Sequence, residues 1–78
     1  MDWRNYISSD TEILLGKPVL KGTRISVELL LELLSDGWNH EQLLDSYPQV
    51  TTDHLHAVYA YLRESVSHEL YFPLPKGA

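Results

Sequence analysis

Three positively charged side chains lie in the segment GKPVLKGTRIS, residues 16–26, of a chain that is otherwise acidic. Lys17, Lys21 and Arg24 stand there among two glycines and a proline. Three interpretations compete: a phosphate-binding loop, a nucleic-acid contact, or a tight turn. A phosphate loop needs Gly-Lys-Ser/Thr opening a helix after a longer spacer, whereas here Pro18 follows Lys17 and removes an amide donor. The spacing excludes the phosphate loop and leaves the other two interpretations open.

The remaining chemically active residues do not form a catalytic or metal-binding set. His54 and His56 are two positions apart on a predicted helix and point in different directions. Glu28 and Glu32 lie four positions apart on one helix face, which is typical of a solvated surface. All four histidines are interpreted as solvated surface residues: His40, His54, His56 and His68. We predict no enzyme activity, no cofactor and no metal site, and the absence of cysteine excludes thiolate ligands.

The charge distribution separates the two parts of the chain. Residues 1–24 carry four basic and three acidic side chains, a net +1, while residues 25–78 carry two basic and eight acidic ones, a net −6. Nucleic-acid affinity depends on cations that displace counterions, so the N-terminal third is the favoured place for any nucleic-acid contact. The alternative is that this uneven charge distribution is unrelated to any binding partner.

These residues are positioned by short β segments followed by helices. Residues 6–25 are predicted to form β pieces, chiefly EILL and PVL, with a tight turn at Lys21-Gly22. Ser26 is predicted to cap a first helix that Gly37 ends. Asn39 caps a second helix in NHEQLLDSY, and Thr51 caps a third through about Ser67.

The resulting fold class is mainly α: a three-helix bundle preceded by a small N-terminal β element. The second helix, the YPQV turn and the third helix have helix-turn-helix proportions. With 78 residues the chain is predicted to be one domain, residues 1–69, with an extended C-terminal tail, residues 70–78. No apolar run approaches the roughly 20 residues that span a bilayer, and the polar start lacks a signal-peptide core, so we expect a cytoplasmic protein.

The first helix carries more apolar surface than a small core requires. Its core face is predicted to contain Val27, Leu30, Leu31 and Leu34. Leu29 and Leu33 form a second strip, for which a homodimer or partner contact and packing on the β segments are alternatives. The predicted apolar stripe of the third helix is Leu55, Val58, Tyr59, Leu62 and Val66.

The tail contains aromatic residues and prolines. Tyr71 and Phe72 are predicted either to dock on a partner or to fold back over the domain.

The third helix is poorly suited to reading DNA bases. Reading helices usually present Arg, Lys, Asn or Gln near their N-termini, whereas this one presents threonine, aspartate and histidine. If DNA is bound, Lys17, Lys21 and Arg24, doubled by dimerisation, are the better candidates. An ion pair between Arg24 and a helix acid is the alternative for that residue.

The run from Gly16 to Leu62 closely resembles the prokaryotic domain-of-unknown-function family four-three-three, and the resemblance covers about residues 7–62. The family shares a Gly-x-Pro-Val-Ile-x-Gly-Thr-Arg-Ile run, a helix ending in Gly, and a Tyr-Pro-x-Leu-Thr turn. The matching residues are Gly16, Pro18, Val19, Gly22, Thr23, Arg24, Ile25, Gly37, Tyr47, Pro48 and Thr51. Leu20 replaces isoleucine, Val50 replaces leucine, and His54 stands where the family often has an acid.

The resemblance implies a homeodomain-like fold and, for many members, the antitoxin role in a type II toxin–antitoxin pair. The implied partner is a PIN-like ribonuclease toxin, with autoregulation of the operon through operator DNA. We therefore predict an antitoxin that forms a homodimer and binds its toxin partly through Tyr71 and Phe72. A stand-alone DNA-binding regulator and a small adaptor domain without a toxin are the alternatives.

Overall fold

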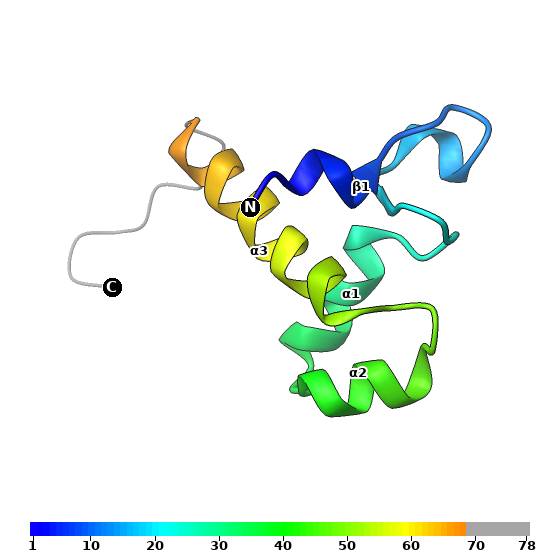
Figure 1. The fold of residues 1–78 in the computed structure, drawn as a ribbon, viewed down its shortest axis with the longest axis vertical. Coiled ribbons are helices and arrows are strands. Elements are labelled where there is room, and N and C mark those ends of the chain that lie inside the picture. The colour runs from blue at the N-terminus through cyan, green and yellow to red at the C-terminus, as the bar shows by residue number, and fades with distance from the viewer. Residues whose placement is uncertain (69–78) are drawn as a thin grey trace.

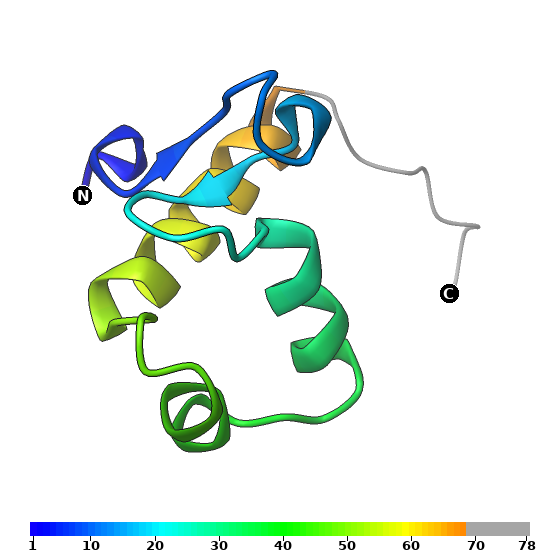
Figure 2. The same cartoon turned by 90° about the vertical axis from the view of Figure 1, so that its right-hand side faces the viewer.

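A computed structural model describes residues 1–68, and the tail with Tyr71 and Phe72 lies outside the described residues. Three helices follow a small two-stranded antiparallel sheet, which confirms the predicted fold class (Figures 1 and 2). The elements are the 3-10 turn η1 (Trp3–Asn5), β1 (Ile7–Ser8), η2 (Leu14–Gly16), β2 (Val19–Leu20), α1 (Val27–Ser35), α2 (His40–Ser46) and α3 (Thr52–Ser67).

The helix ends follow from local capping residues, as predicted. The Ser26 hydroxyl accepts the amide of Leu29 at 3.0 Å, which satisfies a donor that the first turn of α1 leaves free. Asn39 and Gln42 form a reciprocal capping box at α2. Beyond α1, Gly37 adopts a φ of 98°, which a side-chain-bearing residue rarely adopts.

The β element pairs β1 with β2, joining Ile7 to Leu20 and Ser8 to Val19. The prediction for EILL was wrong: only Ile13 makes a bridge, to Asp10, and the chain then enters η2. The two strands must reverse direction within the ten residues that separate them, and η2 lies in this connection. After β2 the chain turns back, and Val19 bridges to Ser26, which places the start of α1 beside the strand.

The turn η2 places leucine in an unfavourable backbone conformation. Leu14 and Leu15 have φ values of 49° and 57°, in the left-handed region that costs L-residues roughly 1–2 kcal/mol each. The Leu15 side chain is 93% exposed and therefore gains almost nothing from burial.

We expect Leu15→Asn to raise the free energy of unfolding by about 0.5–1 kcal/mol, because Asn tolerates the left-handed region. Urea denaturation measures the change. Leu15→Val is the matched control and should lower stability, because a β-branched residue is strained further at positive φ. An Asn variant no more stable than the parent chain would contradict a left-handed Leu15.

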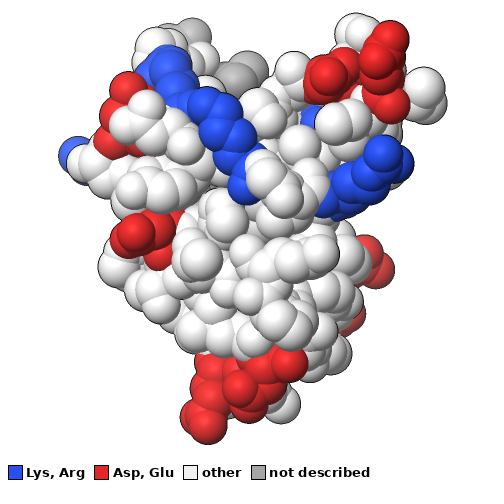
Figure 3. Space-filling view, turned by 45° about the vertical axis from the view of Figure 1, so that its right-hand side comes forward, with Lys and Arg blue, Asp and Glu red and all other residues white. Residues whose placement is uncertain are grey.

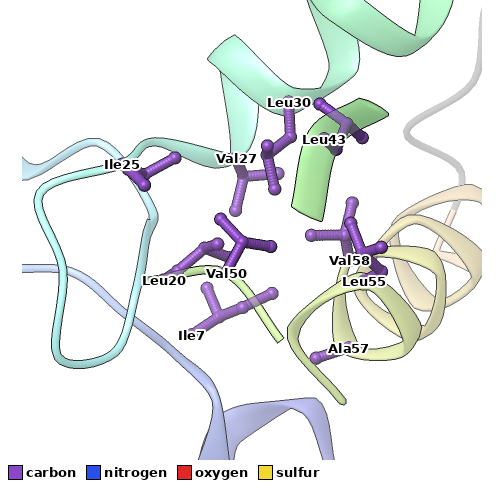
Figure 4. Close-up of a cluster of buried hydrophobic side chains, with 10 residues drawn as sticks. All are labelled: Ile7, Leu20, Ile25, Val27, Leu30, Leu43, Val50, Leu55, Ala57 and Val58. Atoms are coloured by element: carbon purple, nitrogen blue, oxygen red, sulfur yellow. The ribbon is translucent and has the colours of Figure 1, made fainter. Parts of the chain in front are cut away.

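The core lies where the β element and the three helices meet (Figure 4). Leu20, Leu30 and Leu43, one from β2 and one each from α1 and α2, are all 0% exposed. The predicted stripe of α3 is correct for Leu55 and Val58, which are buried.

The same stripe was wrong at two positions. Tyr59 and Val66 are 43% and 55% exposed. The C-terminal half of α3 meets η1 rather than the core, so a regular stripe overestimates burial at Val66. Tyr59 lies nearer the start of the helix, where its hydroxyl is 2.7 Å from a ring nitrogen of the exposed His40.

A clasp of Trp3, Arg4, Tyr61 and Glu64 holds η1 against α3. The Trp3 indole N–H donates to one Glu64 oxygen, and the Arg4 guanidinium contacts the other at 3.0 Å. The rings of Trp3 and Tyr61 pack edge to face, with centroids 5.0 Å apart. The hydrogen bond from the Trp3 indole lowers the pKa of the Glu64 carboxyl below its ordinary value of 4.5, and the hydrogen bond from Arg4 lowers it further by a smaller amount.

This clasp is expected to open in acid. A carboxyl with a lowered folded-state pKa contributes stability above its unfolded-state pKa and loses it as the pH falls through the folded-state value. Trp3 fluorescence, followed below about pH 4.5 in a Trp38→Phe chain, should report the opening. Glu64→Gln should remove that transition, and a transition that survives in Glu64→Gln would contradict the assignment.

Candidate functional site

The structure does not gather the three predicted cations into one site. The Lys17 ammonium lies 2.9 Å from the Glu28 carboxylate on α1. The Lys21 ammonium donates to the backbone carbonyl of Arg4 at 3.3 Å. Within residues 1–68, Arg24 makes neither an ion pair nor a side-chain hydrogen bond, although its side chain is exposed. Figure 3 shows Lys and Arg side chains in the upper half of one face, separated by uncharged surface.

The predicted ion pair between Arg24 and a helix acid was therefore wrong, and Lys17 makes that contact instead. The amide of Val27 donates to the Pro18 carbonyl at 3.0 Å, which brings the residues before β2 beside the first turn of α1. Lys17 can reach Glu28 from there. This arrangement leaves Arg24 as the cation of the opening segment that remains available to a ligand.

Arg24 lines an open cleft with a volume of about 590 Å³. The cleft lies between the turn after β2 and the turn before α3, from which Gln49 contributes. Val19 and Ile25 are apolar lining residues, and the lining includes no aspartate or glutamate. Residue spacing does not predict this cleft, because Arg24 and Gln49 are 25 positions apart in the sequence.

His54 is not the solvated surface residue that the sequence predicted. Only 8% of it is exposed, and both ring nitrogens are engaged. Nδ1 lies 3.1 Å from the amide nitrogen of Thr51, which can only donate, so Nδ1 accepts. Nε2 therefore carries the proton and donates to the Lys21 carbonyl at 3.2 Å. The ring joins the start of α3 to the turn that precedes Arg24.

One sequence signal could have revealed this role. His54 lies three residues after the N-cap Thr51, where a capping box places Glu or Gln. The imidazole acceptor supplies the same hydrogen bond to the cap amide. Its second nitrogen adds the tertiary contact to Lys21, which a local motif does not specify.

We expect His54→Ala to lower the free energy of unfolding by about 2 kcal/mol, because it leaves the Thr51 amide and the Lys21 carbonyl without partners. His56→Ala is the matched control: its side chain is exposed on the same helix, and the change should alter the free energy of unfolding by less than about 0.5 kcal/mol. Urea denaturation compares the two variants. Equal costs would mean that His54 does not join the two segments.

The segment that contains α1, α2 and the first part of α3 presents an acidic surface without Lys or Arg. Between Arg24 and Arg63 the sequence contains no Lys or Arg. This segment carries six exposed carboxylates: Glu28, Glu32, Asp36, Glu41, Asp45 and Asp53. Within residues 1–68 only Glu28 of these pairs with a cation. Figure 3 shows acidic side chains gathered at the foot of the molecule, over α2.

A model of the family described as "Protein of unknown function (DUF433)" matches residues 7–62. The chain belongs to the DUF433 family. The resemblance predicted from the sequence is thereby confirmed, over the same residues.

The DUF433 fold is also found among solved structures. The chain is similar to a DUF433 member protein from Anabaena variabilis ATCC 29413, with a TM-score of 0.74 and 26% sequence identity. The similarity covers 83% of this chain but 64% of that one, so this chain spans less than two thirds of its relative's length. No curated protein matches this chain.

The Gly-Thr-Arg-Ile run of this DUF433 chain forms a fixed turn. Gly22 has a φ of 82°, and the Thr23 hydroxyl donates to the Leu20 carbonyl at 2.8 Å. The Thr23 hydroxyl oxygen also accepts a hydrogen bond from the amide of Ile25 at 3.0 Å. These hydrogen bonds fix the backbone on both sides of Arg24. The run is therefore a stable turn that also positions one exposed cation.

The predicted partner contacts of the DUF433 chain have different outcomes. Leu29 and Leu33 are half-buried and pack against the core, so part of the apolar surplus of α1 is used within the chain. Their role in a homodimer stays a prediction. Tyr71 and Phe72 lie outside the described residues. Among the helices of residues 1–68, none combines the length and apolar character needed to cross a membrane.

Proposed function

We propose that this DUF433 protein is the antitoxin of a type II toxin–antitoxin pair and neutralises a PIN-like ribonuclease. The observation that carries the proposal is the acidic helical surface between Arg24 and Arg63, which contains six exposed carboxylates and no Lys or Arg. Such a surface repels nucleic acid and attracts a basic protein surface.

A ribonuclease offers such a surface, because a groove that binds the RNA backbone must be rich in Lys and Arg. An acidic domain that occupies the groove excludes RNA by competition for the same cations. The family resemblance implies that this ribonuclease is a PIN-like toxin encoded nearby. In this proposal Leu29 and Leu33 contribute to a homodimer, and Tyr71 and Phe72 add apolar contacts to the toxin.

Operator DNA is the second candidate partner, and the exposed Arg24, whose side chain has no partner within residues 1–68, favours it. Dimerisation would present two copies of this cation. The start of α3 argues against reading by that helix, because Asp53 is exposed there and His54 is engaged within the fold. We therefore place DNA binding second to toxin binding, as a property of the complex.

Co-expression with the adjacent open reading frame tests the proposal, with only this chain tagged. Light scattering on the purified material then gives the mass of what is bound. A stable complex with a nuclease whose RNA cleavage is lost at stoichiometric ratio is the expected result. Recovery of this chain alone, at a clean oligomeric mass, would contradict the antitoxin role and favour a regulator or an adaptor.

Salt dependence separates those two remaining functions. Affinity for DNA falls steeply as ionic strength rises, because each phosphate contact releases counterions. Salt-sensitive binding of the chain alone to its own promoter would identify a regulator. An absence of both a nuclease and DNA binding would leave the adaptor.

A further inference from the structure

The cleft beside Arg24 contains hydrogen-bonding groups that the fold does not use. Ser8, Arg24 and Gln49 line it, and within residues 1–68 none of their side chains makes a hydrogen bond or ion pair. In contrast, Lys17 and Lys21 are engaged with Glu28 and with the Arg4 carbonyl. A hydroxyl, a guanidinium and an amide therefore surround one hollow, and each can donate.

The same cleft has an apolar part. Ile13, which is half-buried, contributes aliphatic surface to its lining, beside the buried Val19 and Ile25, which are 2% and 9% exposed. The lining includes no carboxylate, although the chain as a whole carries a net charge of −5. Charge complementarity therefore selects a ligand that is negative at the Arg24 side and apolar where it meets the aliphatic residues.

Nucleic acid fits this cleft poorly. Backbone binding requires several cations along the strand, and Arg24 is the sole Lys or Arg among the lining residues. A carboxylate needs just one guanidinium, which it binds through two parallel hydrogen bonds. A carboxylate and an apolar side chain occur together on the carboxyl-terminal residue of a peptide, and the cleft is large enough to hold both.

We propose that the cleft between β2 and the turn before α3 binds the apolar carboxyl-terminal residue of a partner protein. Arg24 holds the terminal carboxylate, Gln49 and Ser8 donate to the end of the peptide, and the aliphatic residues contact its last side chain. The cleft is distinct from the acidic surface, so this proposal does not depend on the antitoxin role.

Nuclear magnetic resonance titration of the ¹⁵N-labelled full chain with N-acetyl-leucine tests the proposal. This probe carries a carboxylate and an aliphatic side chain on one residue. We expect saturable shifts of the Gly22, Thr23, Arg24 and Gln49 amides, with a millimolar Kd typical of so small a ligand. N-acetyl-leucinamide, which lacks the charge, and N-acetyl-glycine, which lacks the side chain, should each bind at least about tenfold more weakly.

Two variants and one control locate the binding. Arg24→Gln should weaken the binding of N-acetyl-leucine at least about tenfold. Gln49→Glu should weaken this binding to a similar extent, because it places a negative charge in the cleft. Arg63→Gln is the matched control, because Arg63 is equally exposed but lines a different hollow, near Trp3. Backbone spectra of each variant verify the fold.

Three results would overturn the proposal. One is an absence of shifts at these amides, and another is equal binding of the acid and the amide. The third is a single-stranded oligonucleotide that shifts the same amides more strongly than N-acetyl-leucine at physiological salt, which would assign the cleft to nucleic acid.

Discussion

Reversing two charges on the acidic surface, Asp36→Lys with Asp45→Lys, is expected to lower the affinity for the toxin about 100-fold. Each lysine would face a basic groove in place of an attractive carboxylate. Both positions lie at helix C-terminal ends, where a positive charge is favourable to the helix dipole. The double variant should therefore fold as the parent chain does.

Isothermal titration of the co-purified toxin measures this loss. The matched control is Glu12→Lys, which reverses an exposed carboxylate in the N-terminal part, away from the helices. Its effect should be less than threefold, since an isolated charge at a distance is screened by salt. Similar losses from Glu12→Lys and from the double variant would show a long-range charge effect and not a defined acidic contact.

The largest expected loss of stability comes from Leu30→Ala, at about 3 kcal/mol. Leu30 is 0% exposed and lies on α1 within the cluster shown in Figure 4. Its removal leaves a cavity that the surrounding helices fill only in part. A chain of this size has a total stability of about 4–12 kcal/mol, so the loss is a substantial fraction of it.

Leu15→Ala is the internal control, because the same side chain is 93% exposed at that position. Its cost should be within about 0.5 kcal/mol of zero. Urea denaturation of the two variants, with unchanged dependence on denaturant, gives the comparison. A Leu30→Ala variant no less stable than Leu15→Ala would contradict the position of α1 in the core.

The sequence alone determined the features that depend on neighbouring residues. The helix boundaries follow from Ser26, Asn39, Gly37 and Thr51, whose capping bonds or backbone angles act within one turn of the chain. The fold class and the family could also be predicted, because both depend on the order and spacing of these capping residues and of the Gly-Thr-Arg-Ile run along the chain.

Only the tertiary structure decided which polar groups are free to bind a partner. His54 meets the Lys21 carbonyl across 33 positions, and Trp3 meets Glu64 across 61. Lys17 lies beside Glu28 because β2 and the start of α1 are bridged, and the Arg24 side chain is left without a partner in the described part of the chain. Pairing between distant segments depends on how the whole chain packs, whereas a cap depends on one turn. The candidate site therefore could not be read from residue types and spacing.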